Sequence, residues 1–319
     1  MVKRILDCTA SDFRTMNSRE LKESIYAAEG RTILAETVST SPPLISGVSN
    51  AEICVALGAD IIVLNGYDVK KPIIIGIPKN TEAKENILDV EIEGEGATIE
   101  DLKRLIVHPV GIKLEPIDPN ASIAGELTSI SSGRIFSIEN MKLAVKQGSD
   151  FIRIMGNPGS GCTYKTMIKA IKLAKKTVGK KVLIASGKGH GMGVKNDMGM
   201  NCTSPKRVKE LIKAGVDWIV LPAPGTTPGA TVEFVRELVE LAHDHNLLAS
   251  SEMLTSQEGS DVDTIRRIGL FSKMTGADIH HIGDSGYEGI AVPENILALS
   301  IVIRGRRHTY RRMALSPFR

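Results

Sequence analysis

The stretch Gly276-Ala-Asp-Ile-His-His-Ile-Gly-Asp-Ser-Gly-Tyr-Glu-Gly289 indicates how this chain of 319 residues folds. Its short apolar run after Ala-Asp is typical of a buried parallel strand, and three closely spaced glycines follow it. The opening Gly-x-Asp recurs before apolar runs at Gly58, Gly148 and Gly215, each time after a helical pattern. A helix–Gly–x–Asp–strand unit that recurs along a chain predicts a (β/α)8 barrel.

Eight apolar segments, each followed by a helical pattern, complete the barrel. They are residues 32–38, 61–65, 110–115, 151–155, 181–186, 217–221, 247–251 and the run after Asp278. A doubly wound nucleotide-binding sheet would show a glycine fingerprint directly after an early strand. Here the glycines follow the fourth, fifth, sixth and eighth strands, as expected for loops that converge on one face of a TIM barrel.

The remaining segments suggest one domain over residues 1–319 with three additions. Residues 1–30 form an N-terminal cap whose helix, Ser18 to Glu29, has a capping box and covers the bottom of the barrel. Residues 66–97 are a β excursion with extra strands at 72–78 and 87–93. A polar loop at 118–136 is long enough to be a lid, and residues 304–319 form a basic C-terminal tail.

Composition favours a cytoplasmic globular protein. The chain is 42% hydrophobic and 24% charged, and it has neither a signal-peptide pattern nor a run near the ~20 apolar residues of a membrane span. Aromatic residues make up only 4%, which argues against a nucleic-acid-stacking surface. The four cysteines are far apart and lack paired metal-ligand spacing, so we expect reduced thiols.

The net charge of +3 is unevenly distributed. Residues 304–319 hold six arginines and no acid, which leaves 34 basic against 37 acidic residues elsewhere. A basic tail on a mildly acidic body suggests a local contact, and we expect a homo-oligomer contact rather than a solvated tail or a phosphate clamp.

Alternation along the predicted strands sorts side chains into two faces. In the third strand the apolar face must meet the helices, so Lys113 and Glu115 point into the barrel. The same rule points Arg153 and Glu36 inward, and His281 lies level with Arg153. His280 would then face the helices unless a bulge reverses the parity.

The inward side chains form a cluster of mixed sign. Buried charges are costly unless paired, and these residues can neutralise one another. The cluster is therefore either an ion network that fills a barrel layer or catalytic machinery at the carboxyl ends of the strands. Its members are Glu36, Lys113, Glu115, Arg153 and His281, with Glu252 at the end of the seventh strand to orient them.

The loop after the fifth strand, Gly187-Lys-Gly-His-Gly-Met-Gly193, is the sharpest local signal. Flanking glycines free the backbone to bring a cation and an imidazole over the barrel mouth. Lys188 would form a Schiff base with a carbonyl substrate or bind phosphate as a point charge. His190 would act as general acid or base. The alternative is a flexible, solvated glycine loop.

Other glycine-rich loops suggest anion sites. Residues 156–163 have the spacing of a Walker A loop, but Cys162 replaces the lysine, so nucleotide triphosphate binding is not expected. Cys162 itself is expected to be an inert helix-start residue. Loops after the last barrel strands often hold phosphate, and the alternative is a tight turn that needs glycine for geometry. The predicted phosphate- or carboxylate-binding residues are Gly283, Asp284, Ser285, Gly286, Asn157 and Gly225.

A divalent metal such as Mg²⁺ is an alternative cofactor, although no ligand motif is present. Hard cations prefer oxygen ligands. The candidate ligands are Glu36, Glu115, Asp118 and His190.

Several stretches resemble a little-characterised bacterial barrel family from Arg4 to Ala314. They are Ile33-Leu-Ala-Glu-Thr-Val38, Leu221-Pro-Ala-Pro-Gly-Thr-Thr-Pro-Gly229, residues 255–266 and His280-His-Ile-Gly-Asp284. The chain is also loosely similar to phosphoenolpyruvate mutase and other phosphate-binding barrels. It departs from the mutases after the third strand, where Glu115-Pro-Ile-Asp118 replaces their acidic metal motif.

These observations favour an enzyme that acts on a small phosphorylated or carboxylated carbonyl metabolite. It would be a lyase, an aldolase or an isomerase, working by proton transfer or carbon–carbon cleavage. A metal-assisted, phosphonomutase-like lyase or hydrolase is one alternative. A non-catalytic protein that binds a phosphorylated metabolite is the other. No nucleic-acid or membrane partner is expected.

Overall fold

The computed structural model describes residues 2–77 and 94–319, and its eight parallel strands close into a barrel in chain order. The predicted (β/α)8 barrel is confirmed. The strands are β1 (Thr32–Val38), β2 (Ile61–Asn65), β3 (Val110–Leu114), β4 (Phe151–Ile154), β5 (Leu183–Gly187), β6 (Trp218–Pro222), β7 (Leu248–Met253) and β8 (Ile279–Ile282).

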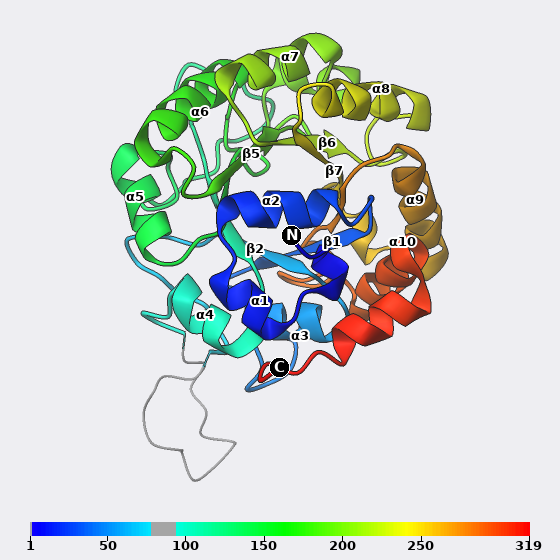
Figure 1. The fold of residues 1–319 in the computed structure, drawn as a ribbon. Coiled ribbons are helices and arrows are strands. Elements are labelled where there is room, and N and C mark those ends of the chain that lie inside the picture. The colour runs from blue at the N-terminus through cyan, green and yellow to red at the C-terminus, as the bar shows by residue number, and fades with distance from the viewer. Residues whose placement is uncertain (1, 78–93) are drawn as a thin grey trace.

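A ring of helices surrounds the strands (Figure 1). It consists of α3 (Asn50–Ala56), α4 (Ile99–Ile106), α5 (Ile138–Lys146), α6 (Tyr164–Val178), α7 (Pro205–Ala214), α8 (Val232–His243), α9 (Val262–Met274) and α10 (Pro293–Met313). Short 3₁₀ turns are η1 (Ile5–Asp7), η3 (Lys195–Asp197), η4 (Gly199–Asn201) and η5 (Gln257–Gly259). No helix among the described residues is both long and apolar enough to cross a membrane.

Several strand boundaries differ from the sequence prediction by one or two residues, and β5 and β3 show why. β5 begins at Leu183 because the amide of Lys181 still donates to the Val178 carbonyl at the end of α6. β3 ends at Leu114, and Glu115 forms only an isolated parallel bridge with Ile135. Both shifts are small. They arise because strand ends depend on loop contacts, which a hydrophobic pattern does not encode.

The N-terminal segment lies across one end of the barrel, where Figure 1 shows α1 (Ala10–Thr15) and α2 (Ser18–Tyr26) in front of the strands. The Asn17 side chain accepts from the backbone N–H of Glu20, and the Glu20 carboxylate accepts from the backbone N–H of Asn17, as in a capping box. Buried side chains of this segment join the inward-facing apolar residues in one cluster. Its members include Ile5, Phe13, Leu21 and Ile25 with Leu34, Ile61, Phe151, Trp218, Leu248 and Ile279.

The barrel interior therefore has an apolar layer next to this segment and a polar layer above it. Register pairs Lys113 with Arg153 and Glu252 with His281, so these residues of the polar layer lie side by side on neighbouring strands. Outward-facing residues such as Ile112 and Ile152 pack against the helices. The polar layer lies toward the carboxyl ends of the strands, where barrel active sites occur.

The recurring Gly-x-Asp has a structural reason. Each aspartate precedes an even-numbered strand, and its carboxylate accepts the backbone N–H of a residue near the start of the preceding odd-numbered strand. The same two residues also pair through the aspartate N–H and the partner's carbonyl. The pairs are Asp60 with Ile33, Asp150 with Val110, Asp217 with Ile184 and Asp278 with Ala249, with N···O distances of 2.8–2.9 Å to the carboxylates.

Each of these aspartates also binds a basic side chain from the helix that precedes the odd-numbered strand. α4 supplies Lys103, α6 supplies Lys175 and α8 supplies His243, while α10, which closes the ring before β1, supplies Arg304 and Arg312. The barrel is thus built from four similar two-strand units, and one aspartate carboxylate joins the strands of each pair.

The β excursion predicted at 66–97 is described only in part. Residues 72–77 form no strand, and Ile73 makes an isolated antiparallel bridge with Glu95. The strand predicted at 72–78 is therefore wrong over the described residues. The strand predicted at 87–93 lies outside the described residues.

The predicted C-terminal tail continues α10 as far as Met313. The helix kinks at Gly305, whose φ of 74° lies in the left-handed region that glycine tolerates. Arg304 and Arg312 are buried against Asp60, and Arg311 binds Asp7 on the surface. Three of the six arginines therefore pair within their own chain, and the expected homo-oligomer contact stays a prediction.

Candidate functional site

The centre of the polar layer is Glu36 at the carboxyl end of β1. Its Oε1 accepts from Lys113 of β3, and its Oε2 accepts from Arg153 of β4 at 2.9 Å and lies 3.0 Å from His281 Nε2 of β8. All four side chains are at most 5% exposed. One buried carboxylate thus joins basic groups from three other strands.

A second carboxylate completes this cluster. Glu252 of β7 binds Arg153 and accepts a hydrogen bond from Ser250 at 2.6 Å. It also lies 3.9 Å from His281 Nδ1. Arg153 is therefore held between two carboxylates, as a buried guanidinium requires if its charge is to be matched.

Electrostatics favour the charged form of the central acid. Burial alone would raise the pKa of Glu36, but Lys113, the hydrogen bond from His281 and Arg153 together hold that pKa well below its ordinary value. Two buried nitrogens near it, Arg153 Nε and His281 Nδ1, have no hydrogen-bond partner among the described residues. Such atoms are rare in folded proteins and are often found where a ligand or water binds.

A hydrogen-bond chain extends the cluster across the mouth. Lys113 also donates to Asn157 Oδ1 at 3.2 Å, and the Asn157 backbone N–H donates to Glu115 at 3.0 Å. Arg134 binds Glu115 at 2.6 Å. The Asn157 side chain reaches Asn65 at 2.9 Å. The segment predicted to be a lid, residues 118–136, therefore contributes Arg134 to the mouth.

Lys188 is placed differently from the sequence prediction. Its ammonium is buried and donates to the Cys162 carbonyl at 2.7 Å, to the Gly191 carbonyl at 3.5 Å and to Asp197 at 2.8 Å. Burial lowers the pKa of Lys188, although Asp197 opposes this shift. With all three protons directed at protein acceptors, this ammonium has the geometry of a structural tie between three segments.

His190 lies within electrostatic reach of the central cluster and is partly exposed. Burial lowers its pKa to about 4, with Lys113 and Lys188 adding to the effect. A group with so low a pKa is neutral near pH 7, so His190 is a weak general base there. Its Nδ1 accepts a hydrogen bond from the Met192 backbone N–H.

The Walker-like loop leads into α6 without a nucleotide-binding lysine. Thr163 is the N-cap of α6, and its side chain donates to Asp118 at 2.9 Å. Cys162 is buried, and burial raises its pKa to about 12. A thiol with this pKa is unreactive at neutral pH, in line with the inert role expected for it.

The glycine loop after β8 already contacts an acid. The backbone N–H of Ser285 donates to Glu258 Oε1 at 3.3 Å, and a Cβ at Gly283 would lie 2.4 Å from the same oxygen. Burial raises the pKa of Glu258, and its Oε2 has no partner among the described residues. Asp284 binds Asn65 at 2.8 Å, and burial together with Glu36 raises its pKa.

Two of the predicted anion-binding glycines, Gly286 and Gly225, have different structural surroundings. Gly286 lies against α10, where a Cβ would meet the Val292 nitrogen at 2.3 Å, so this position requires glycine for close packing. The N–H of Gly225 donates to the Ala230 carbonyl within its own loop. Gly225 therefore offers no free amide to an anion, contrary to the sequence prediction.

The predicted metal ligands do not converge. Glu36 faces cations, Glu115 binds Arg134 and Asn157, and Asp118 accepts from Thr163. Within residues 2–77 and 94–319, no group of three or more His, Cys, Asp or Glu side chains is arranged to hold a metal ion.

Sequence reasoning missed several residues of the site. They are Asn65, Arg134, Asp197, Ser250 and Glu258. Asn65 and Ser250 had a usable signal, since they share parity with the inward-facing residues of β2 and β7. The other three lie on loops, where no side-chain period indicates direction.

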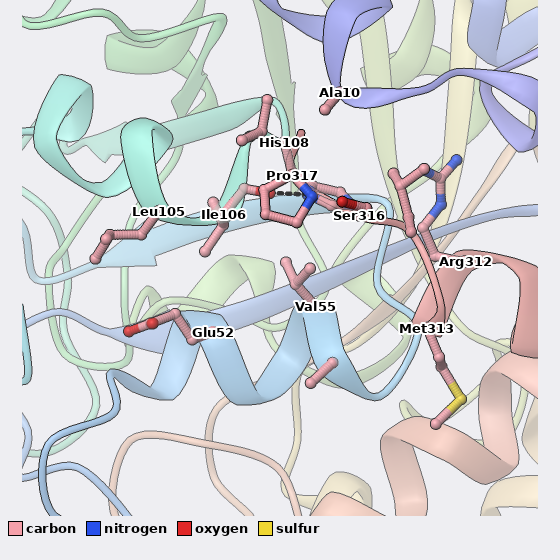
Figure 2. Close-up of a pocket in the computed structure, with 13 residues that line it drawn as sticks. Ala10, Glu52, Val55, Leu105, Ile106, His108, Arg312, Met313, Ser316 and Pro317 are labelled. Atoms are coloured by element: carbon pink, nitrogen blue, oxygen red, sulfur yellow. Dashed lines mark hydrogen bonds between the residues drawn. The ribbon is translucent and has the colours of Figure 1, made fainter. Parts of the chain in front are cut away.

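A pocket of about 200 Å³ lies at the opposite end of the molecule, next to the N-terminal segment (Figure 2). Glu52 and Val55 of α3 line one side, and Ile106 and Pro317 lie across from them. Its walls are mainly apolar, and the buried Arg312 that borders it is bound to Asp60. It contains none of the residues predicted to act at the barrel mouth.

The chain is similar to a known protein family and to a solved structure. A family model described as "Domain of unknown function (DUF7916)" matches residues 6–319. No curated protein matches the chain. Among solved structures, the chain is similar to thiamine phosphate pyrophosphorylase from Pyrococcus furiosus, with a TM-score of 0.44 and 13% sequence identity over 87% of this chain and 97% of that one. The looser similarity to phosphoenolpyruvate mutase barrels stays a prediction.

Proposed function

The chain belongs to the DUF7916 family, and we propose that it is an enzyme acting on a small carbonyl metabolite that carries a phosphate or carboxylate group. The observation that supports this proposal is the convergence of Lys113, Arg153 and His281 on the Glu36 carboxylate at the carboxyl ends of the strands. Barrel enzymes place their catalytic groups at this end. An ion network alone would be expected to pair all its polar atoms, whereas this cluster leaves Arg153 Nε and His281 Nδ1 without a partner among the described residues.

Lys113 is the lysine we assign to the chemistry. Lys188 has three protein acceptors, whereas Lys113 has two among the described residues, so one N–H of Lys113 is left for a substrate. The neutral amine would attack the substrate carbonyl carbon and form a carbinolamine. Loss of water then leaves an iminium that draws electrons from the neighbouring carbon. The proton that Lys113 gives up returns to the carbinolamine hydroxyl and leaves in the water, so a positive iminium replaces the ammonium beside Glu36, which remains the carboxylate counter-ion.

Proton transfer at the substrate carbon would fall to groups around this amine. His281 Nε2 lies 3.0 Å from Glu36, and its Nδ1 has no hydrogen-bond partner among the described residues, so this ring would relay a proton between Glu36 and a bound substrate. Glu115 faces the same mouth and is oriented by Arg134 and Asn157. Lyase, aldolase and isomerase reactions all break a C–H or C–C bond at the carbon next to an electron-withdrawing group, here the iminium.

The anionic group of the substrate would lie toward the loops after β7 and β8, a frequent phosphate site in barrels. The Glu258 carboxyl accepts a hydrogen bond from the Ser285 amide there, and burial raises its pKa. Arg134, which is 22% exposed, offers a cation on the other side of the mouth.

Borohydride trapping tests the proposal. The protein is incubated with triose phosphates, sugar phosphates and 2-oxo acids, each with borohydride, and modified peptides are located by mass spectrometry. Borohydride supplies the hydride that reduces an iminium to a stable secondary amine. We expect a substrate-dependent label on Lys113, lost in Lys113→Arg and kept in Lys188→Arg, the matched buried lysine.

Thermal shift with the same compounds, with and without Mg²⁺, separates the alternatives, because a true ligand raises apparent stability by mass action. A compound that stabilises the protein but gives neither turnover nor label would favour the non-catalytic binding protein. Turnover that is abolished by chelation and leaves Lys113 unlabelled would replace the amine mechanism with the metal-assisted one.

A further inference from the structure

The tautomer of His190 is fixed by its own loop. The backbone N–H of Met192 donates to His190 Nδ1 at 3.1 Å, so that nitrogen must carry a lone pair rather than a proton. In a neutral imidazole the proton is then on Nε2. The hydrogen-bond geometry alone determines this assignment.

The ring is also held in place by a well-anchored turn. Met192 has a left-handed backbone with φ of 54°, a fully buried side chain and a carbonyl that accepts from Gly161. Its sulfur lies 3.3 Å from the Gly156 nitrogen, and Gly193 accepts from Ala124. A loop tied to two other loops in this way cannot rotate freely, so Nε2 keeps one orientation.

The charges around His190 keep the ring neutral. Lys113, Lys188 and Arg153 oppose a positive imidazolium, and Glu36, which would favour it, is already matched by its own cations. Burial acts in the same direction as the cations. Among the described residues, the hydrogen bonds of the His190 side chain involve only Nδ1, so Nε2 of this partly exposed side chain remains available to a ligand.

We propose that His190 acts as a neutral hydrogen-bond donor whose Nε2–H binds an oxygen of the substrate, either the carbonyl oxygen or the oxyanion that develops from it. This inference rests on the proposed function and defines its substrate class more closely, since the ligand must present an oxygen acceptor to Nε2. It replaces the acid–base role expected for His190 from the sequence. A fixed donor stabilises developing charge without giving up its proton.

Nitrogen-15 NMR of the histidine rings, on the full chain without any ligand, tests the tautomer directly. A His190→Gln spectrum assigns the His190 signals by difference. We expect the neutral Nε2–H form from pH 8 to pH 5. Two other buried histidines are internal controls: His280, whose Nε2 faces the Gly30 carbonyl, must show Nε2–H, and His108, whose Nδ1 faces the Ile106 carbonyl, must show Nδ1–H.

A His190 signal with the proton on Nδ1, or protonation with a midpoint near 6.5, would overturn the proposal whatever the substrate proves to be. This readout is independent of the borohydride experiment, so a failure of the enzyme assignment and a failure of the donor assignment are distinguishable.

Once the protein is found to turn over one of the phosphorylated or 2-oxo acid compounds named above, matched variants of His190 test the role of Nε2–H as a hydrogen-bond donor. Glutamine places an N–H near the position of Nε2, whereas asparagine places it near Nδ1. We expect His190→Gln to keep kcat within about tenfold, and His190→Asn and His190→Ala to lose about 10²–10³-fold, the usual cost of one oxyanion donor. Equal activity of the glutamine and asparagine variants would contradict the proposal.

Discussion

Arg304 Nη1 lies 2.5 Å from Asp60 Oδ2 in a fully buried ion pair that joins the last helix of the chain to the start of β2. Asp60 also accepts from the Ile33 amide at 2.8 Å and from Arg312 at 2.8 Å. The Arg304 guanidinium reaches Ser300 as well. One carboxylate therefore connects β1, β2 and both halves of the kinked α10.

Removing one partner of this pair should destabilise the protein strongly. Arg304→Met leaves Asp60 short of a cation, and Asp60→Asn leaves two buried guanidinium groups without a carboxylate. We expect a loss of about 3–5 kcal/mol in the free energy of unfolding for either change, measured by urea denaturation. Arg306→Met, at an exposed position two residues on, is the control and should change stability by no more than about 0.5 kcal/mol. An equal effect of the two arginine variants would contradict this account.

The Glu36 cluster should show strong coupling between its members. Glu36→Gln exposes Lys113, Arg153 and His281 to one another without their shared carboxylate, and we expect a loss of about 3–5 kcal/mol in unfolding free energy. Glu36→Gln with Arg153→Met removes charges of both signs and should lose less than the sum of the single variants. Urea denaturation of the double-mutant cycle measures the difference, and simple additivity would mean that the two groups do not interact.

Two buried histidines should make stability fall in mild acid. Burial lowers the pKa of both His108 and His280 to about 4, whereas an unfolded histidine has a pKa near 6.5. Between these values the unfolded chain binds more protons, so unfolding free energy decreases as pH falls from about 6.5 toward 4. The expected loss is about 3 kcal/mol for each histidine, at about 1.4 kcal/mol per pKa unit.

His243 should act with the opposite sign. Its hydrogen bond to Asp278 raises its pKa, so its contribution is present in mild acid and is lost as pH rises through the raised value. Urea denaturation of His280→Gln and His243→Gln between pH 7 and pH 5 measures both signs. The slope of stability against pH should flatten in the first variant and steepen in the second. Parallel slopes in all three proteins would show that neither histidine titrates differently on folding.

Gly111 should not tolerate a side chain. It faces inward from β3, and a Cβ there would lie 2.4 Å from the ring of Phe151 on β4. We expect Gly111→Ala to cost about 1–3 kcal/mol in unfolding free energy because the core is overpacked. Gly111→Ala with Phe151→Leu provides room for the methyl group and should be more stable than the sum of the two single changes predicts. The absence of such rescue would indicate that the strain lies in the backbone.

The sequence was most informative where side-chain direction follows a fixed period. Alternation predicted that Lys113, Arg153 and Glu36 point inward, because the apolar residues between them must face the helices. It also predicted that His280 faces outward, an arrangement that looked costly. The structure retains it, because the His280 Nε2 finds the Gly30 carbonyl at 3.0 Å.

The other features of the site and fold could not be predicted, because they depend on loop residues or on partners far apart in the sequence. Lys188 follows the last residue of β5, so no period indicated its direction, and its partner Asp197 is a loop residue. Arg304 was expected to belong to a basic tail that contacts another subunit, because residues 304–319 hold six arginines and no acid. Its partner Asp60 lies 244 residues earlier, and a single sequence gives no indication of such a pairing.

The four Gly-x-Asp units also have a consequence for how the chain matures. Three of them take their basic group from a helix that leaves the ribosome before the aspartate does, so each can be completed during synthesis. The unit at Asp60 depends on Arg304 and Arg312, which are made last. β1 and β2 are therefore translated first, but the ion pairs that join them to α10 form last. A nascent chain that still lacks Arg304 and Arg312 leaves the Asp60 carboxylate without its two cations.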